Sequence, residues 1–214
     1  MKKYFREPIS GFTHLFGAII SLIGLIALIY KQFHSESNPL NMLSVIIFGL
    51  SLIFLYSASS LYHLTISSDR VIKNLRRLDH SMIFVLIAGT YTPVCLIALE
   101  SYWRWTLFIL VWAFAILGIF FKYFWVDCPK WLSACIYVFL GWIAIFAISP
   151  LKKVLPIGGI FYLVLGGILY TLGAVIYCFE KKNIKRDFGP HEIFHIFVLL
   201  GSLSHYFFIF KYVM

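Results

Sequence analysis

The stretch IGGIFYLVLGGILYTLGAVIYCF occupies residues 157–179 and contains no charged side chain. A helix needs about 20 apolar residues to cross the ~30 Å hydrocarbon core of a bilayer, so this stretch predicts a membrane-spanning helix. Six further apolar stretches of similar length stand between charged or proline-containing breaks. The seven predicted spans are Phe12–Tyr30, Leu40–Leu64, Ser81–Leu99, Trp105–Phe121, Trp131–Ser149, Ile157–Phe179 and Ile193–Phe210.

The composition agrees with this interpretation. The 214 residues are 61% hydrophobic and only 13% charged, and the mean hydropathy is +0.90. A soluble domain carries roughly twice that fraction of charged residues. We therefore expect an all-α membrane protein in which residues 1–214 form a single seven-transmembrane helix bundle, multi-pass in the cell membrane.

The net charge of +9 predicts membrane topology rather than nucleic-acid binding, because the basic residues are distributed by loop. Cytoplasmic loops are enriched in Lys and Arg. This rule places the N-terminus in the cytoplasm and the C-terminus outside. The predicted inner side carries Lys2, Lys3, Arg6, Arg70, Lys73, Arg76, Arg77, Lys122, Lys130, Lys181, Lys182, Lys185 and Arg186, and the outer side only Lys31, Arg104, Lys152, Lys153 and Lys211.

Polar residues from three predicted helices reach one membrane depth under this topology. His63 ends the second helix, Asp79 begins the third, and His191 and His195 begin the seventh. The two histidines of the seventh helix are four residues apart and share one helix face. We predict that His63, His191 and His195 bind Zn²⁺ near the cytoplasmic face, with a water in the fourth position. Asp79 would orient that water or accept its proton, and Ser59, one turn before His63, would assist.

Simpler interpretations remain open for several of these residues. Asp79 at a helix start is also typical of an N-cap, and Ser59 of a small packing residue. His14 and His80 lie at a depth suited to orienting a metal ligand, whereas His205 is expected to be a buried hydrogen-bonding residue. The role of Glu192 depends on the rotation of its helix.

Three ordered motifs resemble those of the bacterial hemolysin III family, within the progestin and adiponectin receptor superfamily. They are Ser59-x-x-x-His63, Leu78-Asp79-His80-Ser81 and His191-x-x-x-His195, and an amino-terminal Glu7, Ser10 and Thr13-His14 segment is also similar. The resemblance covers essentially the whole chain. It implies seven helices with the N-terminus inside, a zinc ion at His63, His191 and His195, and a zinc-bound water held by Asp79. Eukaryotic relatives are linked to ceramidase-like amide hydrolysis and lipid-hormone sensing.

The leading hypothesis is a zinc-dependent hydrolase of lipid amide or ester bonds that acts in membrane-lipid homeostasis, with membrane lipids as substrate or ligand. The first alternative is a receptor-like or haemolytic membrane protein in which the zinc is structural. An intramembrane metalloprotease ranks lower: His191-Glu192-x-x-His195 matches the zinc-hydrolase signature, but such proteases usually place that signature before the Asp-bearing segment.

Overall fold

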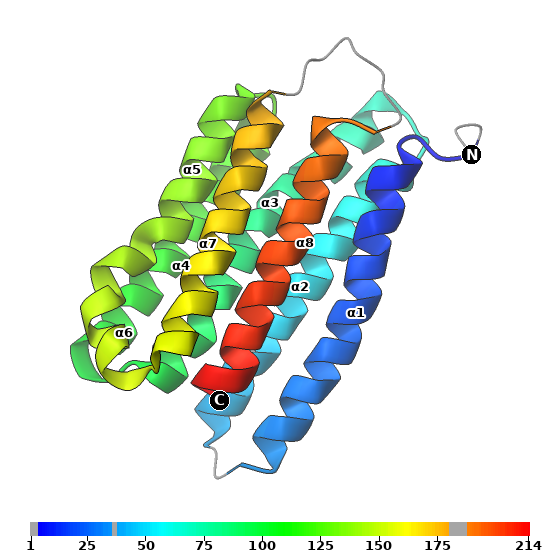
Figure 1. Ribbon diagram of the computed structural model, residues 1–214. Coiled ribbons are helices and arrows are strands. Elements are labelled where there is room, and N and C mark those ends of the chain that lie inside the picture. Colours follow the sequence, from blue (N-terminus) through cyan, green and yellow to red (C-terminus); the bar gives the residue numbers. More distant parts are fainter. Residues whose placement is uncertain (1–3, 36–37, 180–187) are drawn as a thin grey trace.

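The computed structural model describes residues 4–35, 38–179 and 188–214 of the chain, and in them it contains seven membrane-spanning helical segments. This confirms the predicted fold class. Figure 1 shows the segments as one bundle. The helices are α1 (Pro8–Phe33), α2 (Pro39–Leu64), α3 (Asp69–Pro93, continued by a π-helix at Val94–Ala98), α4 (Ser101–Phe124), α5 (Lys130–Trp142), a 3-10 helix at Ile143–Ala147, α6 (Ile148–Val154), α7 (Ile157–Cys178) and α8 (Pro190–Phe208, continued by a π-helix at Ile209–Val213).

Proline begins three of these helices. Pro8, Pro39 and Pro190 occupy the first helical position of α1, α2 and α8. Proline suits this position because the first backbone N–H groups of a helix have no acceptor within the helix. Asn38 adds a side-chain cap to α2 by accepting a 2.9 Å hydrogen bond from the Asn41 backbone N–H.

Two of the predicted spans differ from the structure in ways that bear on the site or on the helix geometry. α3 begins at Asp69, twelve residues before the predicted Ser81, and its N-cap residue is Ser68. Asp79 therefore lies in the interior of a helix, and the N-cap interpretation of this residue is wrong. The predicted fifth helix, Trp131–Ser149, is interrupted by a 3-10 segment, so α5 and α6 together form one span.

The arrangement of the helices brings distant parts of the sequence together at one end of the bundle. α1 packs against α2, α2 against α3, α3 against α4, and α7 against α8, while α8 also contacts α1. Figure 1 shows that α1 and α8 begin, and α2 ends, at the end of the bundle drawn uppermost. We call this the site end. His63, Asp79 and His191 all belong to the site end, as the shared-depth argument predicted.

Small residues allow α2 and α3 to approach closely beneath the site end. A Cβ atom added to Gly89 of α3 would come within 2.3 Å of the Ser51 hydroxyl of α2. Such contacts replace the hydrophobic driving force that is missing between helices in a lipid environment. They hold His63 and Asp79 in a fixed relation because each lies on one of the two helices.

One residue of the predicted inner side lies in the protein interior. Lys122, in the last turn of α4, flanks the loop between α4 and α5 as expected, but its side chain is fully buried. Its ammonium group donates hydrogen bonds to Cys128 Sγ at 3.1 Å and to Ser133 Oγ at 2.5 Å. Six residues of the predicted inner side lie outside the described residues, namely Lys2, Lys3, Lys181, Lys182, Lys185 and Arg186. The orientation of the bundle in the membrane stays a prediction.

Candidate metal centre

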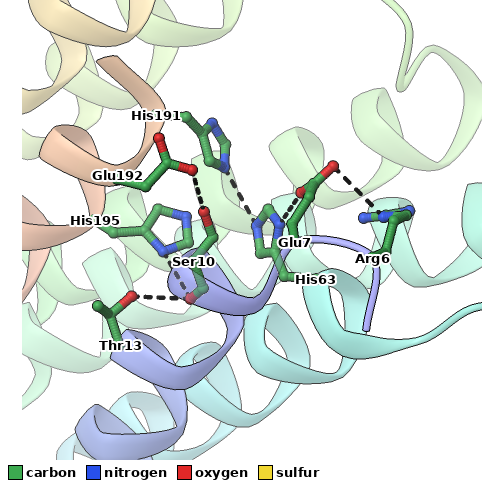
Figure 2. A network of polar contacts seen from close by, with 8 residues as sticks. All are labelled: Arg6, Glu7, Ser10, Thr13, His63, His191, Glu192 and His195. Carbon is green, nitrogen blue, oxygen red and sulfur yellow. Dashed lines mark hydrogen bonds and ion pairs between the residues drawn. The ribbon is translucent and has the colours of Figure 1, made fainter. Parts of the chain in front are cut away.

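Three imidazole rings meet at the site end. His63 comes from the last turn of α2, and His191 and His195 come from the first two turns of α8. One potential ligand nitrogen of each ring lies within 4.8 Å of those of the other two. The Nε2 atoms of His63 and His191 are 3.3 Å apart. Figure 2 shows the three rings converging from α2 and α8. We call these residues the imidazole triad.

The hydrogen bonds of two rings leave Nε2 available as a ligand. His63 Nδ1 is hydrogen-bonded to the Glu7 carboxylate, and His195 Nδ1 lies 3.2 Å from the Ser10 backbone carbonyl oxygen. Carboxylate and carbonyl oxygens only accept hydrogen bonds, so Nδ1 carries the proton in each ring. The Nε2 atoms therefore keep their lone pairs, which is the form in which histidine binds a metal ion.

The geometry and chemistry of the triad fit a metal ion. Zinc binds imidazole nitrogen at about 2.0–2.1 Å in a tetrahedral arrangement, which places two ligand nitrogens about 3.3 Å apart. The His63 to His191 separation has this value. Neutral imidazoles suit zinc and several other transition metals. The residues present can therefore hold a metal ion.

The beginning of α1 supports both partner helices. The Glu7 backbone N–H donates a 2.9 Å hydrogen bond to the His63 carbonyl oxygen, while the Glu7 side chain holds the His63 ring. Burial raises the pKa of the Glu7 carboxyl, but the hydrogen bond from His63 and the charge of Arg6 outweigh this effect and lower the pKa below its ordinary value. Glu7 is thus an anion at neutral pH. Arg6 Nε lies 3.5 Å from its other oxygen.

The Glu192 side chain links α8 to α1 by a hydrogen bond. Its Oε1 accepts a 2.9 Å hydrogen bond from the Ser10 hydroxyl, and its Oε2 accepts one at 2.8 Å from the Gly189 backbone N–H. The second contact is a one-sided cap at the start of α8, in which the Glu192 carboxylate satisfies the backbone N–H of the N-cap residue Gly189. Figure 2 shows the Glu192 carboxylate directed at Ser10 of α1. Both oxygens therefore have structural partners, unlike those of a glutamate that serves as a general base.

Asp79 lies beside the triad but is not one of its members. The compact group of potential ligands in the described residues consists of the three histidines alone. Asp79 is buried on α3, and the Ser59 hydroxyl of α2 lies next to its carboxylate. The predicted pair of Asp79 and Ser59 is thus brought together near the triad, and both side chains line the same cavity as the three histidines.

His14 and His80 surround the triad. The His14 ring stacks on the His195 ring at a centroid distance of 3.7 Å and an interplanar angle of 15°. It also makes a T-shaped contact with the Tyr56 ring at a centroid distance of 5.0 Å. His80 lines the cavity, and its backbone carbonyl accepts a 3.1 Å hydrogen bond from the Tyr137 hydroxyl. Stacking fixes the orientation of the His195 ring, which is a supporting role of the kind expected for His14.

A cavity of about 1570 Å³ extends from the triad into the bundle. It is lined by the site end of α1 and by α2, α3, α5, α7 and α8. The triad, Asp79 and Ser59 lie along it, and farther in the lining is largely apolar, with residues such as Ile83, Leu86, Ile87, Val138 and Leu163. The arrangement therefore places polar groups suited to hydrolysis next to a volume suited to hydrocarbon chains.

Comparisons with known proteins agree with the motifs. The chain matches the family described as Haemolysin-III related over residues 2–206. It is 39% identical over 216 residues to Hemolysin-3 of Bacillus cereus, and the matched region covers 100% of this chain and 95% of that protein. It is 38% identical over 202 residues to the Hemolysin-3 homolog of Bacillus subtilis (strain 168), and the matched region covers 94% of this chain and 92% of that protein. Monocyte to macrophage differentiation factor of Homo sapiens is 24% identical over 216 residues, covering 97% and 84%.

Proposed function

The chain belongs to the haemolysin-III-related family, and we propose that it is a zinc-dependent hydrolase of amide or ester bonds in membrane lipids. It is a multi-pass membrane protein, and its similarity to the human factor links it to the progestin and adiponectin receptor superfamily. One observation carries the proposal. The imidazole triad and the Asp79 carboxylate line one cavity whose deeper lining is largely apolar.

The imidazole triad, Asp79 and Ser59 each have a role in this hydrolysis. A Zn²⁺ ion held by the triad supplies Lewis-acid chemistry, which polarises an acyl carbonyl and makes water more acidic. Asp79 takes a proton from the attacking water as the new C–O bond forms. The C–N or C–O bond to the leaving group then breaks, and Asp79 returns the proton to the leaving nitrogen or oxygen. The products are a fatty acid and an amine or alcohol, and Ser59 keeps the Asp79 carboxylate in position.

The proposed site faces the cytoplasm, and the protein lies in the cell membrane with its N-terminus inside. Support comes from the basic residues that the structure describes at the site end, which include Arg6, Arg70, Lys73, Arg76 and Arg77. Lys and Arg are enriched in cytoplasmic loops. A lipid would enter the cavity sideways from the bilayer and bring its polar linkage to the depth of the triad.

Lipid hydrolysis by purified zinc-loaded protein tests the proposal. The substrates are a panel of N-acyl and O-acyl lipids in mixed micelles, and released fatty acid is measured with and without a chelator. We expect chelator-sensitive release, reduced by about 10²- to 10⁴-fold in Asp79→Asn, because the general base is lost. Asp69→Asn is the matched control, since Asp69 is exposed at the start of α3 and does not line the cavity. Equal activity of both variants would contradict the assignment of Asp79.

The same experiment distinguishes the alternatives. An intramembrane metalloprotease would need Glu192 as its base, but both oxygens of this carboxylate accept structural hydrogen bonds. Glu192→Gln should therefore retain zinc and lipid hydrolysis. A receptor-like or haemolytic protein would use the ion only to join α2 to α8. That function predicts bound zinc and a zinc-dependent thermal midpoint without hydrolysis of any lipid in the panel.

A further inference from the structure

One of the six cavity-lining histidines in the described residues, His205, lies far below the triad. His205 follows His195 by ten residues on α8, which corresponds to about 15 Å along the helix axis. Its side chain is 7% exposed and lines the same cavity. The ring stacks on Tyr170 at 5.3 Å and 15°. It also lies against Gly166, where an added Cβ would come within 2.3 Å of the His205 Cε1 atom. The imidazole is therefore held in one place.

One nitrogen of this ring has a lone pair without a protein partner. His205 Nδ1 lies 3.0 Å from the Gly201 carbonyl oxygen, so Nδ1 carries the proton and donates it. In the neutral ring, Nε2 is then a hydrogen-bond acceptor. Across residues 4–35, 38–179 and 188–214, no donor reaches it. Polar groups inside a membrane protein are costly without a partner and generally face a cavity or a ligand.

The other polar side chains that line the cavity at this depth bond within the protein. Thr90, eleven residues beyond Asp79 on α3, lies at a similar depth. Each of these groups has a hydrogen-bond partner other than His205. The bonds run from Thr90 to the Leu86 carbonyl, from Tyr91 to the Gly141 carbonyl, from Trp142 to Thr171, from Thr171 to the Gly167 carbonyl, and between Tyr170 and Ser202.

We propose that His205 forms a second polar subsite, which accepts a hydrogen bond from a hydroxyl group midway along a lipid acyl chain. The inference rests on the proposed function, which places the polar end of that chain at the triad. An extended chain advances about 3.5 Å over three bonds, or about 1.2 Å per bond. A separation of about 15 Å then corresponds to about twelve bonds. The preferred ligand is an acyl chain hydroxylated near its twelfth carbon.

Selectivity follows from the cost of an unpaired acceptor. A plain hydrocarbon chain that fills the cavity covers His205 Nε2 and leaves it without a donor, whereas a hydroxyl at this depth satisfies it. A site built to bond a hydroxyl discriminates against the analogue that lacks it. One neutral hydrogen bond corresponds to a preference of up to about tenfold in affinity.

Equilibrium binding of free fatty acids tests the subsite. The probes are octadecanoic acid, its derivative hydroxylated at the twelfth carbon, and its derivative hydroxylated at the third carbon, each competing with a fluorescent fatty acid on zinc-loaded protein. We expect the first hydroxy acid to bind about tenfold more tightly than the other two. His205→Phe should abolish this preference and retain affinity for octadecanoic acid, because the ring remains without its acceptor.

Two further variants separate the subsite from a folding effect. Gly166→Ala should also weaken the preference, since the new methyl group displaces the imidazole. His34→Phe, at an exposed histidine, is the matched control and should bind like the unchanged protein. An equal affinity for all three acids, or a preference that survives in His205→Phe, would overturn the inference. Binding needs no turnover, so a lack of hydrolysis would count against the proposed function alone.

Discussion

Replacing Glu7 tests whether the first residues of α1 determine metal affinity. Glu7 belongs to neither metal-binding helix, yet its carboxylate accepts the Nδ1 proton of His63. This bond selects the tautomer that presents Nε2 and makes that nitrogen more basic. Glu7→Gln keeps an acceptor oxygen but removes the charge, whereas Glu7→Ala removes both. The backbone hydrogen bond from residue 7 to the His63 carbonyl is unaffected by either change.

The exposure of Glu7 helps to set the expected loss of zinc affinity in these variants. Loss of a residue that orients a metal ligand typically weakens metal binding by 10- to 100-fold, and each factor of ten corresponds to about 1.4 kcal/mol. The Glu7 side chain is 45% exposed, so solvent screens part of its charge. We therefore expect about tenfold weaker zinc binding for Glu7→Gln, or about 1.4 kcal/mol, and a loss nearer 100-fold for Glu7→Ala.

Competition with a chromogenic zinc chelator measures these affinities in detergent. Glu100→Gln makes the same chemical change at an exposed residue just before α4 and controls for the change in net charge. Its zinc affinity should match that of the unchanged protein. If Glu7→Ala binds zinc as tightly as the unchanged protein does, Glu7 does not orient His63 and the supporting role of α1 is refuted.

Three further predictions concern the ion and the loops. Replacement of any one triad histidine by alanine should abolish stoichiometric zinc in the purified protein, measured by elemental analysis, whereas His34→Ala should retain it. A chelator should lower the thermal midpoint, because an ion bound only to the folded state stabilises it; an unchanged midpoint after verified zinc removal would exclude this contribution. Hydrogen bonding to Lys73 and the charge of Arg76 lower the pKa of the exposed Asp127 carboxyl. These contacts should therefore contribute about 0.2–1 kcal/mol to the free energy of unfolding above pH ~4. Because folding lowers this pKa, the stability difference between the unchanged protein and Asp127→Asn should vanish as the pH falls through the lowered value, as followed by thermal midpoints.

Long apolar runs explain why the helices were predictable. The stretch at residues 157–179 differs by one residue from α7 as the structure has it. The start of α3 was missed for the same reason. Residues 69–80 include Asp69, Arg70, Lys73, Arg76, Arg77 and Asp79, so a search for apolar residues ends the span at Ser81. The helix nevertheless continues toward the site end, where its polar residues meet the connection between α4 and α5.

The spacing of the histidines predicted part of the site. His191 and His195 are four positions apart, and this spacing alone places both rings on one helix face. Adding His63 required the topology, because residues 63 and 191 are far apart in the chain. The structure brings all three together.

The contacts of α1 and the buried amine of α4 were beyond sequence analysis. Glu7 and Ser10 precede or begin an apolar helix, and only the motif similarity marked them as notable. Their roles depend on where α1 packs against α2 and α8, which no local pattern encodes. Its charge grouped Lys122 with the inner-side residues, but the sequence did not show that the side chain is buried with a thiol and a hydroxyl as partners. Such an environment is exceptional for lysine.

Glu7 and Asp79 have different roles in the proposed reaction: Glu7 supports metal binding, and Asp79 transfers the proton. Glu7 is partly exposed, and its bond to His63 uses it to hold a ligand. Asp79 is buried and lies beside Ser59 on the cavity wall. Saturating zinc should therefore restore hydrolysis in Glu7→Gln, whose defect is affinity, but should leave Asp79→Asn inactive, because its defect is proton transfer. Recovery of Asp79→Asn with added zinc would instead assign this carboxylate to metal binding.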